Sequence, residues 1–347
     1  MIIKSYKHNY EVKIEDDFDI KKYIDNENCF FVIDKNVYEL YKNHFIGIKQ
    51  NKLYIFDAIE SNKNLDAVID ICDRFTDISA KKNAVLLSFG GGITQDVTGF
   101  VANILYRGIK WIFYPTTLLA ACDSCVGSKT SLNFKNYKNL IGTFYPPSEI
   151  VINSSCFKTL TNYDLASGLG EIVKFNVLRG VGTIAKLEDD IEKLIALNLP
   201  TIKAYIENSL TFKKEFVETD EFDNGIRVKL NFAHTFGHSI ETASDYMIPH
   251  GTAVAIGTVI ANYISMQRKL LPKNIYDRIV NLVKQIVFIN VNCVDFNKII
   301  MAIKNDKKQI SNDIRAILLD GNFDLNVIYL SEKEIIEAFS EVWKVFS

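Results

Sequence analysis

A buried strand followed at once by three glycines constrains the fold of this chain more than any other feature. The run AVLLSF (84–89) is a short apolar segment of the kind found inside a sheet, and the glycines at 90–92 follow it. DVTGFVANILY (96–106) then has helical spacing, and WIFYP (111–115) is a second apolar strand closed by proline. This order predicts a βαβ unit of a parallel, nucleotide-binding sheet.

The two halves of the chain differ in pattern. In the first half, CFFVID (29–34) predicts another buried strand and LDAVIDICDRF (65–75) an amphipathic helix. From about Cys156 the chain is a series of segments with helical spacing, at 163–178, 181–196, 199–218, 227–245, 250–268, 274–288, 295–303 and 332–345. We therefore predict an α/β, Rossmann-like nucleotide-binding domain over 1–157 and an all-α domain over 158–347. The polar stretch KNDKKQISND (304–313) predicts a loop.

Bulk composition excludes several classes of protein. The 347 residues carry a formal charge of −2, which gives no reason to expect nucleic acid or an anionic membrane as a partner. The first residues lack the apolar stretch of a signal peptide, and no run is long enough for a transmembrane helix. The six cysteines are scattered, which predicts reduced thiols in a cytoplasmic protein. Cys122 and Cys125 form a lone CxxC without a nearby histidine, which disfavours a metal or redox role.

The histidines are gathered in one part of the chain. Only five are present, and three of them are His234 and His238, in NFAHTFGHSIE (231–241), and His250, in IPHG. If 231–241 is a helix, the first two lie one turn apart on one face, and His250 starts the next helix. Converging imidazoles suit a divalent transition metal, so the spacing predicts His234 and His238 as joint ligands.

A metal site with three protein ligands also favours a carboxylate. The best candidate is Glu171, a lone acidic residue in the apolar segment SGLGEIVKF. Two histidines and one glutamate would leave an open coordination position, as in catalytic sites. The alternative is that each histidine is an ordinary capping or core residue.

Basic residues lie among small and apolar ones. CDSCVGSKTSLNFKNYKNLIGTFYPP (122–147) contains Asp123, Lys129, Lys138 and Asn139, a composition that suggests phosphate or carboxylate contacts rather than a solvated surface. The glycines at 90–92 would let backbone approach an anion at a helix N-terminus. They do not match G-x-G-x-x-G, however, and a tight turn is the alternative.

For other charged residues, the sequence alone leaves more than one role open. Lys174 lies one turn after Glu171, on the same helix face. Arg107 would either cap a helix end or reach an anion, and Lys213 also fits a surface position on an amphipathic helix.

Together these motifs resemble the 3-dehydroquinate synthase family and its sugar phosphate cyclase relatives. The similarity runs from about Asp34 to Arg315, through GGGITQDVTGFVANILYRG, YPTTLLAACDSCVGSKT, KNLIGTFYPP, ASGLGEIVKF and NFAHTFGHSIE followed by PHG. It implies a two-domain enzyme, usually a homodimer, that uses catalytic NAD and one zinc or cobalt ion. The implied reaction converts 3-deoxy-D-arabino-heptulosonate 7-phosphate, a sugar phosphate, to 3-dehydroquinate and phosphate on the pathway to aromatic amino acids.

The resemblance also implies roles for individual residues. The implied metal ligands are Glu171, His234 and His250, with His238 beside the substrate phosphate instead of on the metal. The implied catalytic residues are Asp123, Lys174, Lys213, Arg227, Asn231 and His238. The implied substrate-binding residues are Arg107, lent by the partner subunit, with Lys129, Lys138, Asn139, Asp223 and Arg315. The implied NAD-binding residues are Asp34, Glu60, Lys63, Gly91, Gly92, Asp96, Thr116, Thr117, Lys138 and Thr159.

Some positions depart from the family pattern. Ser128 precedes Lys129 where glycine is usual, Lys135-Asn136-Tyr137 replaces a proline-x-glycine, Asp223 replaces glutamate, and Gln95 precedes Asp96 where a small residue is common. These changes leave the reaction class intact but bear on the substrate.

Several relatives therefore remain as alternatives. An Arg227–Lys213 pair that holds a carboxylate favours 3-dehydroquinate synthase over cyclases of sedoheptulose 7-phosphate or glucose 6-phosphate, which have no carboxylate to bind. The loop departures instead favour a specialised cyclase, such as an aminodehydroquinate or valiolone-type synthase. A metal-dependent polyol dehydrogenase, such as glycerol-1-phosphate dehydrogenase, and a catalytically inactive binding protein are less favoured.

Overall fold

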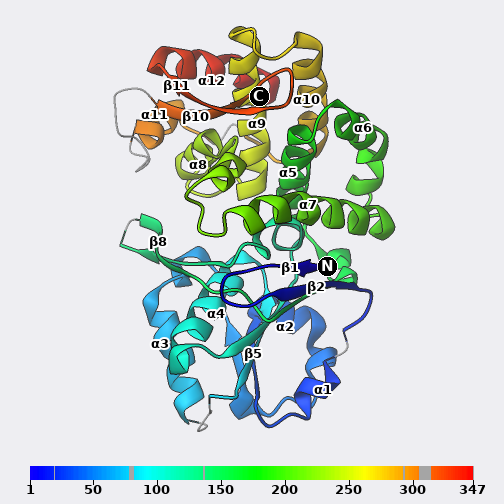
Figure 1. The fold of residues 1–347 in the computed structure, drawn as a ribbon, viewed down its shortest axis with the longest axis vertical. Helices are drawn as coiled ribbons and strands as arrows, with labels where there is room; N and C mark the ends of the chain where they lie inside the picture. The colour runs from blue at the N-terminus through cyan, green and yellow to red at the C-terminus, as the bar shows by residue number, and fades with distance from the viewer. Residues whose placement is uncertain (19, 78–81, 136, 292–293, 305–313, 347) are drawn as a thin grey trace. The chain divides into compact units, whose positions relative to one another are not determined.

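The structure, a computed structural model, describes residues 1–18, 20–77, 82–135, 137–291, 294–304 and 314–346 and divides into two compact units (Figure 1). The first unit contains Met1–Thr159 and Lys213–Phe222, and the second contains Leu160–Phe212 and Asp223–Ser347. Among the described residues, no helix is both long and apolar enough to cross a membrane.

The first unit is built on a seven-stranded sheet. In spatial order its strands are β1 (Ile2–Ile3), β2 (Tyr10–Glu15), β9 (Glu149–Asn153), β6 (Lys110–Pro115), β5 (Val85–Gly90), β3 (Cys29–Asp34) and β4 (Leu53–Phe56). Only the β1–β2 pair is antiparallel, and all the other neighbours are parallel. The predicted parallel sheet is therefore confirmed, with β6 in the middle of the strand order and β4 at one edge.

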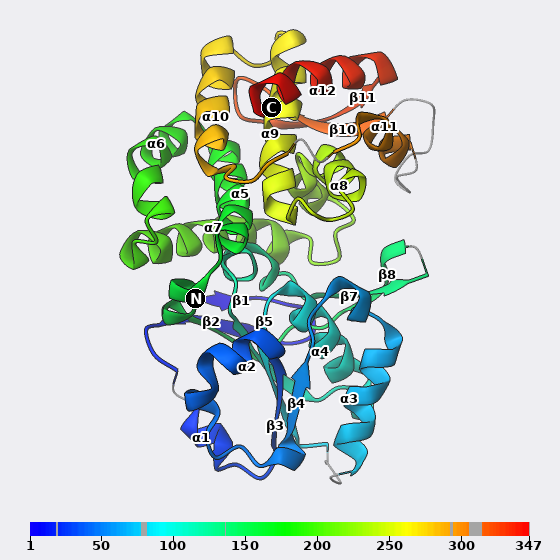
Figure 2. The same ribbon diagram turned by 180° about the vertical axis from the view of Figure 1, so that it is seen from behind.

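Helices cover both faces of this sheet. They are α1 (Lys21–Ile24), α2 (Lys35–Tyr41), α3 (Leu65–Asp77) and α4 (Gly92–Ile104). Val37 of α2 packs with Phe31 and Phe89 in one core cluster. On the opposite face, the ring of Phe30 packs against that of Phe75 of α3 in a tilted arrangement, and α4 packs on β5. Figure 2 shows α2 on one side of the strands and α3 and α4 on the other. Residues that alternate along each strand therefore reach two apolar layers, as buried parallel strands require.

The glycine turn joins β5 directly to α4. The helix begins at Gly92, four residues before the predicted start at Asp96. A Cβ at Gly90 would lie 2.3 Å from Oγ1 of Thr94, in the first turn of α4, so the helix can approach the strand end only because no side chain is present there. The segment after the next strand, which the sequence left unassigned, forms an antiparallel hairpin of β7 (Lys129–Phe134) and β8 (Tyr137–Phe144).

The second unit is mainly helical, as predicted. Its helices are α5 (Asn162–Leu178), α6 (Val181–Ile195), α8 (His234–Ala243), α9 (His250–Gln267), α10 (Lys273–Ile286), α11 (Phe296–Lys304) and α12 (Glu332–Phe346), together with α7 (Leu199–Thr219) up to Phe212. Helix α9 is buried along almost its whole length and contacts α5, α8, α10 and α12. Figure 1 shows α9 in the middle of this unit.

Two details of the helical unit differ from the sequence prediction. It is not all-α, because β10 (Ile314–Leu319) and β11 (Leu325–Leu330) form an antiparallel hairpin that contacts α9 through β10. Their short runs are rich in Ile, Leu and Val, and the Asp320 carboxylate accepts hydrogen bonds from the backbone of the turn between them. The predicted loop at 304–313 lies almost entirely outside the described residues.

The second difference is the start of the histidine helix. Residues Ile226–Asn231 form a short 3-10 helix (η7), and α8 begins only at His234. Ala233 has a left-handed backbone with φ of +69°, which ends any continuous helix through 231–241.

Candidate functional site

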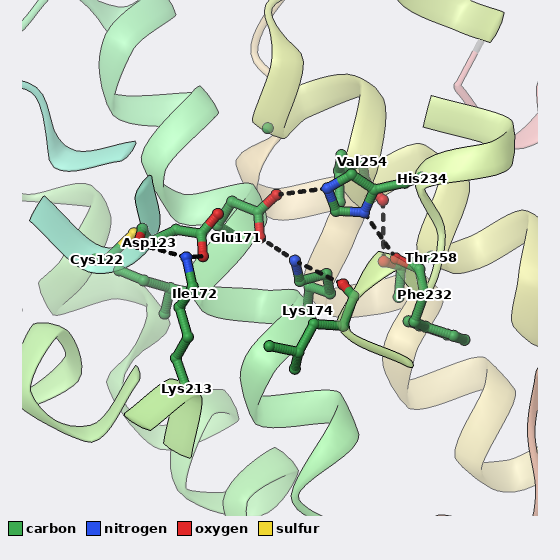
Figure 3. Close-up of polar contacts among 12 residues, drawn as sticks. Cys122, Asp123, Glu171, Ile172, Lys174, Lys213, Phe232, His234, Val254 and Thr258 are labelled. Atoms are coloured by element: carbon green, nitrogen blue, oxygen red, sulfur yellow. Dashed lines mark hydrogen bonds and ion pairs between the residues drawn. The ribbon is translucent and has the colours of Figure 1, made fainter. Parts of the chain in front are cut away.

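Three helices of the second unit bring the candidate metal ligands together. Glu171 lies in the middle of α5, whereas His234 and His250 are the first residues of α8 and α9. Oε1 of Glu171 lies 3.5 Å from Nε2 of His250 and 3.8 Å from Nε2 of His234. The ligand atoms of His234, His238 and His250 all lie within 4.8 Å of one another. Figure 3 shows Glu171 with His234 on one side and Lys174 on the other.

Two glycines allow the helices that carry Glu171 and His250 to meet. A Cβ on Gly251 would lie 1.7 Å from the carbonyl oxygen of Ser167, and one on Gly170 would lie 1.9 Å from that of Gly251. No side chain fits at either position, so the backbones of α5 and α9 touch. Because each glycine is next in sequence to a ligand, this contact fixes the separation of Glu171 and His250.

The Glu171 carboxylate is fully buried, and neither oxygen has a hydrogen-bond partner of good geometry among the described residues. Its ion-pair partner is Lys174, whose Nζ lies 2.5 Å from Oε2 and which is itself 2% exposed. Burial alone would raise the pKa of Glu171, but Lys174 and His250 outweigh it and hold that pKa at about 2. The carboxylate is therefore ionised and presents Oε1 to the two imidazoles.

Hydrogen bonds at Nδ1 orient both candidate histidine ligands. Nδ1 of His234 lies 3.0 Å from the carbonyl oxygen of Phe232, and Nδ1 of His250 lies 2.9 Å from Oε2 of Glu241. In each ring the Nε2 atom then faces Glu171. Burial and Lys174 hold the pKa of His234 well below its usual value. Burial also opposes charge on His250, but Glu241 and Glu171 raise its pKa to about 10.

The donor set fits a tetrahedral zinc or cobalt ion. Two ligand atoms about 2.1 Å from such an ion lie roughly 3.4 Å apart, and the two carboxylate–imidazole distances here are 3.5 and 3.8 Å. Oε1 of Glu171, which has no hydrogen bond among the described residues, would gain a partner from the ion. His238 is exposed, with its ring centroid 5.2 Å from that of His234 and 5.6 Å from that of His250.

Four other site residues predicted for this unit lie on the segments that flank α8. Arg227 is buried and Asn231 half-buried on η7, and Asp223 precedes them with φ of +58°. Arg315 is the second residue of β10, and its carbonyl oxygen faces the hydroxyl of Thr235 in the first turn of α8 at 3.5 Å. Lys174 joins α5 to η7, because its Nζ lies 3.5 Å from the carbonyl oxygen of Leu230.

In the first unit, the buried Lys213 forms an ion pair with the half-buried Asp123. Asp123 lies on a π-helix, η5 (Ala120–Ser124), a form often found at functional sites. Nζ of Lys213 donates to both the carbonyl oxygen and Oδ1 of Asp123, each at 2.7 Å (Figure 3). An ammonium has three N–H groups, so one donor remains for another ligand. The surface-lysine interpretation of Lys213 is therefore wrong, because its side chain is buried and paired.

Half of the predicted NAD residues lie at the carboxyl ends of parallel strands. Asp34 ends β3, Gly91 and Gly92 follow β5, and Thr116 and Thr117 follow β6. In sheets of this kind ligands bind beyond the carboxyl ends of the strands, where the strand order reverses. The Asp34 carboxylate accepts from the backbone N–H groups of Asn36 and Val37, so it also caps α2. Thr159 lies apart from the glycines in sequence and bonds to the hydroxyl of Tyr41 at 2.6 Å.

The remaining predicted NAD residues form a polar network on the β7–β8 hairpin. Nζ of Lys63 lies 2.5 Å from Oδ2 of Asp96 and donates to Oδ1 of Asn139 at 2.7 Å. Burial raises the pKa of Asp96, and Lys63 opposes that effect. Lys138 lies 3.3 Å from the carboxylate of Glu60. Asn133 joins this pair to the rest, because its amide donates to Glu60 and accepts from the backbone N–H of Asn139. The network therefore links four NAD candidates to Asn139, a substrate candidate.

The other substrate candidates of this unit are exposed. Lys129 begins β7 and shares a strand face with Ser131, whose hydroxyl lies 2.9 Å from Oδ1 of Asn139. Arg107 ends a short helix in a left-handed conformation, with φ of +63°.

The departures from the family pattern have visible consequences. Ser128 has φ of +62°, where glycine would be unstrained, and its hydroxyl donates to Glu221 at 2.6 Å. Gln95 bonds to Ser124 through both ends of its amide. Asn136 lies outside the described residues. Cys122 and Cys125 are buried, and burial raises the pKa of the Cys125 thiol to about 12, so this thiol is held in its unreactive protonated form.

Sequence reasoning missed two residues in these networks, Glu241 and Ser131. Glu241 had a readable signal, since it lies seven residues after His234 and therefore on the same face of α8. Ser131 gave no such signal, because only the pairing of β7 with β8 places it beside Asn139.

Comparisons with known proteins give a consistent result. Residues 53–167 match the N-terminal model of 3-dehydroquinate synthase, and residues 168–309 match the C-terminal model. The chain is 35% identical to the 3-dehydroquinate synthase of Clostridium tetani over 334 residues, which cover 95% of this chain and 88% of that protein.

Two solved structures share the fold. One is 2-deoxy-scyllo-inosose synthase complexed with carbaglucose-6-phosphate, NAD+ and Co2+, with a TM-score of 0.85, 22% identity and coverage of 98% of this chain and 99% of that chain. The other is 2-epi-5-epi-valiolone synthase from Streptomyces hygroscopicus with NAD+ and Zn2+, with a TM-score of 0.84, 22% identity and coverage of 96% and 97%. At this identity the likeness concerns the fold.

Proposed function

This chain belongs to the 3-dehydroquinate synthase family, and on that premise we propose how its residues carry out the family reaction. The reaction converts 3-deoxy-D-arabino-heptulosonate 7-phosphate to 3-dehydroquinate and phosphate, so the enzyme is a phosphate-eliminating lyase that closes a carbocycle. The observation that carries the proposal is the buried Glu171 carboxylate, which pairs with Lys174 through Oε2 and faces two imidazole Nε2 atoms through Oε1.

The cofactors are NAD and a zinc or cobalt ion. Glu171, His234 and His250 would hold the ion, and Lys174 would balance the charge of Glu171. When bound, the ion supplies Lewis acidity to substrate hydroxyls, and NAD accepts a hydride and later returns it. The proposed NAD contacts are Asp34, Glu60, Lys63, Gly91, Gly92, Asp96, Thr116, Thr117, Lys138 and Thr159.

Basic residues divide between the two anionic groups of the substrate. We assign the phosphate to Lys129, Asn139, His238 and Arg315, with Arg107 supplied by the partner subunit of a homodimer. Arg227 and Lys213 would bind the carboxylate, and a guanidinium can grip it with two parallel hydrogen bonds. Asp123 holds Lys213 in place and uses two of its three donors, which leaves one for substrate.

The remaining assignments concern the residues that position the substrate and the compartment in which the enzyme works. Asp123, Lys174 and Asn231 would contact the reacting part of the substrate, with Asp223 nearby, and hold it in one pose through several steps. We propose a cytoplasmic enzyme, in keeping with five free cysteines among the described residues.

A phosphate-release assay tests the function directly. The purified protein, with NAD and zinc or cobalt, is expected to release phosphate from 3-deoxy-D-arabino-heptulosonate 7-phosphate without net formation of NADH. Parallel reactions contain sedoheptulose 7-phosphate, glucose 6-phosphate or a simple polyol. Release from one of the other sugar phosphates alone would contradict the substrate and implicate the departures at Ser128 and Lys135. Net NADH formation from a polyol would instead indicate a dehydrogenase.

The assigned role of Asn139 makes a separate prediction. Lys63 has only N–H donors, so the Asn139 atom 2.7 Å away is the carbonyl oxygen, and the amide NH2 faces away from the network. In Asn139→Asp, Lys63 and Ser131 keep their acceptor, but a charged acceptor replaces the NH2 group. Loss of a hydrogen bond to a charged phosphate predicts a KM higher by about 10- to 100-fold. Metal affinity, measured as the internal control, should not change. An unchanged KM would exclude Asn139 from the phosphate contacts.

A further inference from the structure

We propose that Glu241 is a positioning residue for His250, which fixes the orientation of that imidazole and raises the affinity of the site for its metal ion. The inference rests on the metal centre of the proposed function. It concerns a residue to which neither the sequence motifs nor the family resemblance gave a role.

The geometry places Glu241 behind His250, on the side away from Glu171. Oε2 of Glu241 lies 2.9 Å from Nδ1 of His250, and the Glu241 side chain is 12% exposed. Glu241 occupies the same face of α8 as His234, two turns further along. One helix therefore carries both a candidate ligand and the carboxylate that contacts the other candidate ligand.

Local hydrogen bonds fix the backbone of Glu241 relative to the start of α9. The carbonyl oxygen of Glu241 accepts from the hydroxyl of Ser244 at 3.0 Å and from the backbone N–H of Tyr246 at 2.9 Å. The hydroxyl of Ser244 in turn accepts from the N–H of Ile248, two residues before His250. These hydrogen bonds fix the backbone of the segment between α8 and α9. Glu241 and His250, at its two ends, therefore face each other at a fixed distance.

A carboxylate at this position changes what the imidazole can do. With its proton on Nδ1 and donated to Glu241, a neutral His250 must present the Nε2 lone pair toward Glu171, which is the tautomer a metal needs. The negative charge also makes the ring a stronger electron donor. Glu171 and Glu241 place two negative charges beside the metal site, and Lys174 balances the one on Glu171.

The two candidate histidine ligands are therefore held differently. His234 contacts a backbone carbonyl, which no substitution can remove, whereas His250 contacts a side chain. A substitution of Glu241 therefore changes the orientation of His250 while all three candidate ligands remain in the protein. A purely structural role for Glu241 would affect the stability of α8 without a selective effect on metal affinity.

The test is zinc affinity of the full-length protein, measured by competition with a chromophoric chelator. Glu241→Ala is expected to weaken zinc binding by about 10- to 100-fold, the usual effect of removing such an outer partner. Glu241→Gln keeps an acceptor but loses the charge, so its affinity should lie between those of Glu241→Ala and the wild type. The visible spectrum of the cobalt-loaded protein should shift in Glu241→Ala as the ligand geometry relaxes.

Asp245→Asn is the matched control, because it removes one negative charge four residues away. Asp245 is exposed and pairs with Lys298 instead of a histidine, and its φ of +50° suits asparagine. Zinc affinities of both Glu241 variants within twofold of Asp245→Asn would overturn the inference. If Glu241→Ala fails to fold, as judged by urea unfolding of the metal-free protein, Glu241→Gln alone decides. Absence of zinc binding by the wild type would instead contradict the proposed metal centre itself.

Discussion

The variant His250→Ala is expected to lose both its bound metal and its turnover. His250 supplies one of three candidate protein ligands, and its Nε2 lies 3.5 Å from the ionised Glu171. Loss of a ligand should weaken zinc binding by more than about 100-fold, the upper end of the loss seen for outer partners alone. Metal content by elemental analysis and phosphate release, each with zinc in excess, measure the two losses.

His250→Ala is preferred to Glu171→Ala for this test. Removal of Glu171 would leave Lys174 buried and unpaired, which costs about 3–5 kcal/mol of folding free energy and confuses metal loss with unfolding. His44→Ala is the control, because it removes an exposed histidine of the first unit. Full metal occupancy in His250→Ala would refute the ligand assignment.

The variant Arg227→Ala is expected to bind carboxylate-bearing substrates selectively less well. Arg227 is only 4% exposed, and truncation of one member of a buried charge pair costs about 2–5 kcal/mol, or roughly 30- to 5,000-fold in affinity. The measurement is the dissociation constant of the substrate and of an analogue with a hydroxymethyl group in place of the carboxylate. Only the first should weaken by such a factor.

Arg227→Lys provides the matched comparison. Lysine keeps the positive charge but lacks the planar fork of the guanidinium, so it should recover part of the affinity for the carboxylate. Equal losses for the substrate and the analogue in Arg227→Ala would show that Arg227 acts on another part of the ligand or on the fold around η7.

Much of the fold could be predicted because the local pattern and the tertiary contacts agree. The run at 84–89, the glycines after it and the strand at 111–115 predict a parallel βαβ unit, and the structure pairs β5 with β6 in parallel. The helices at 163–178 and 250–268 were predicted within one residue at each end. The β10–β11 hairpin was missed because short apolar runs fit a strand or a buried helix equally well.

The sequence predicted which residues belong to the candidate site, but it did not predict which of them contact one another. A lone glutamate in an apolar segment and three clustered histidines predicted the candidate metal centre, because a buried charge needs a partner. Sequence spacing first suggested His234 and His238 as joint ligands, since it reports only neighbours on one helix. The start of α8 at His234, after the left-handed Ala233, could not be read from the helical spacing of 231–241.

By itself, the sequence determined the residue types that can bind a metal and two anions, and the strand and helix pattern that carries them. The tertiary structure decided which of them meet. Gly170 and Gly251 let α5 and α9 touch, so Glu171 reaches His250 from 79 residues away in the chain. Glu241 faces Nδ1 of His250, and Lys63 fixes the amide of Asn139. Such contacts depend on the packing of whole helices and strands, and local periodicity carries no information about that packing.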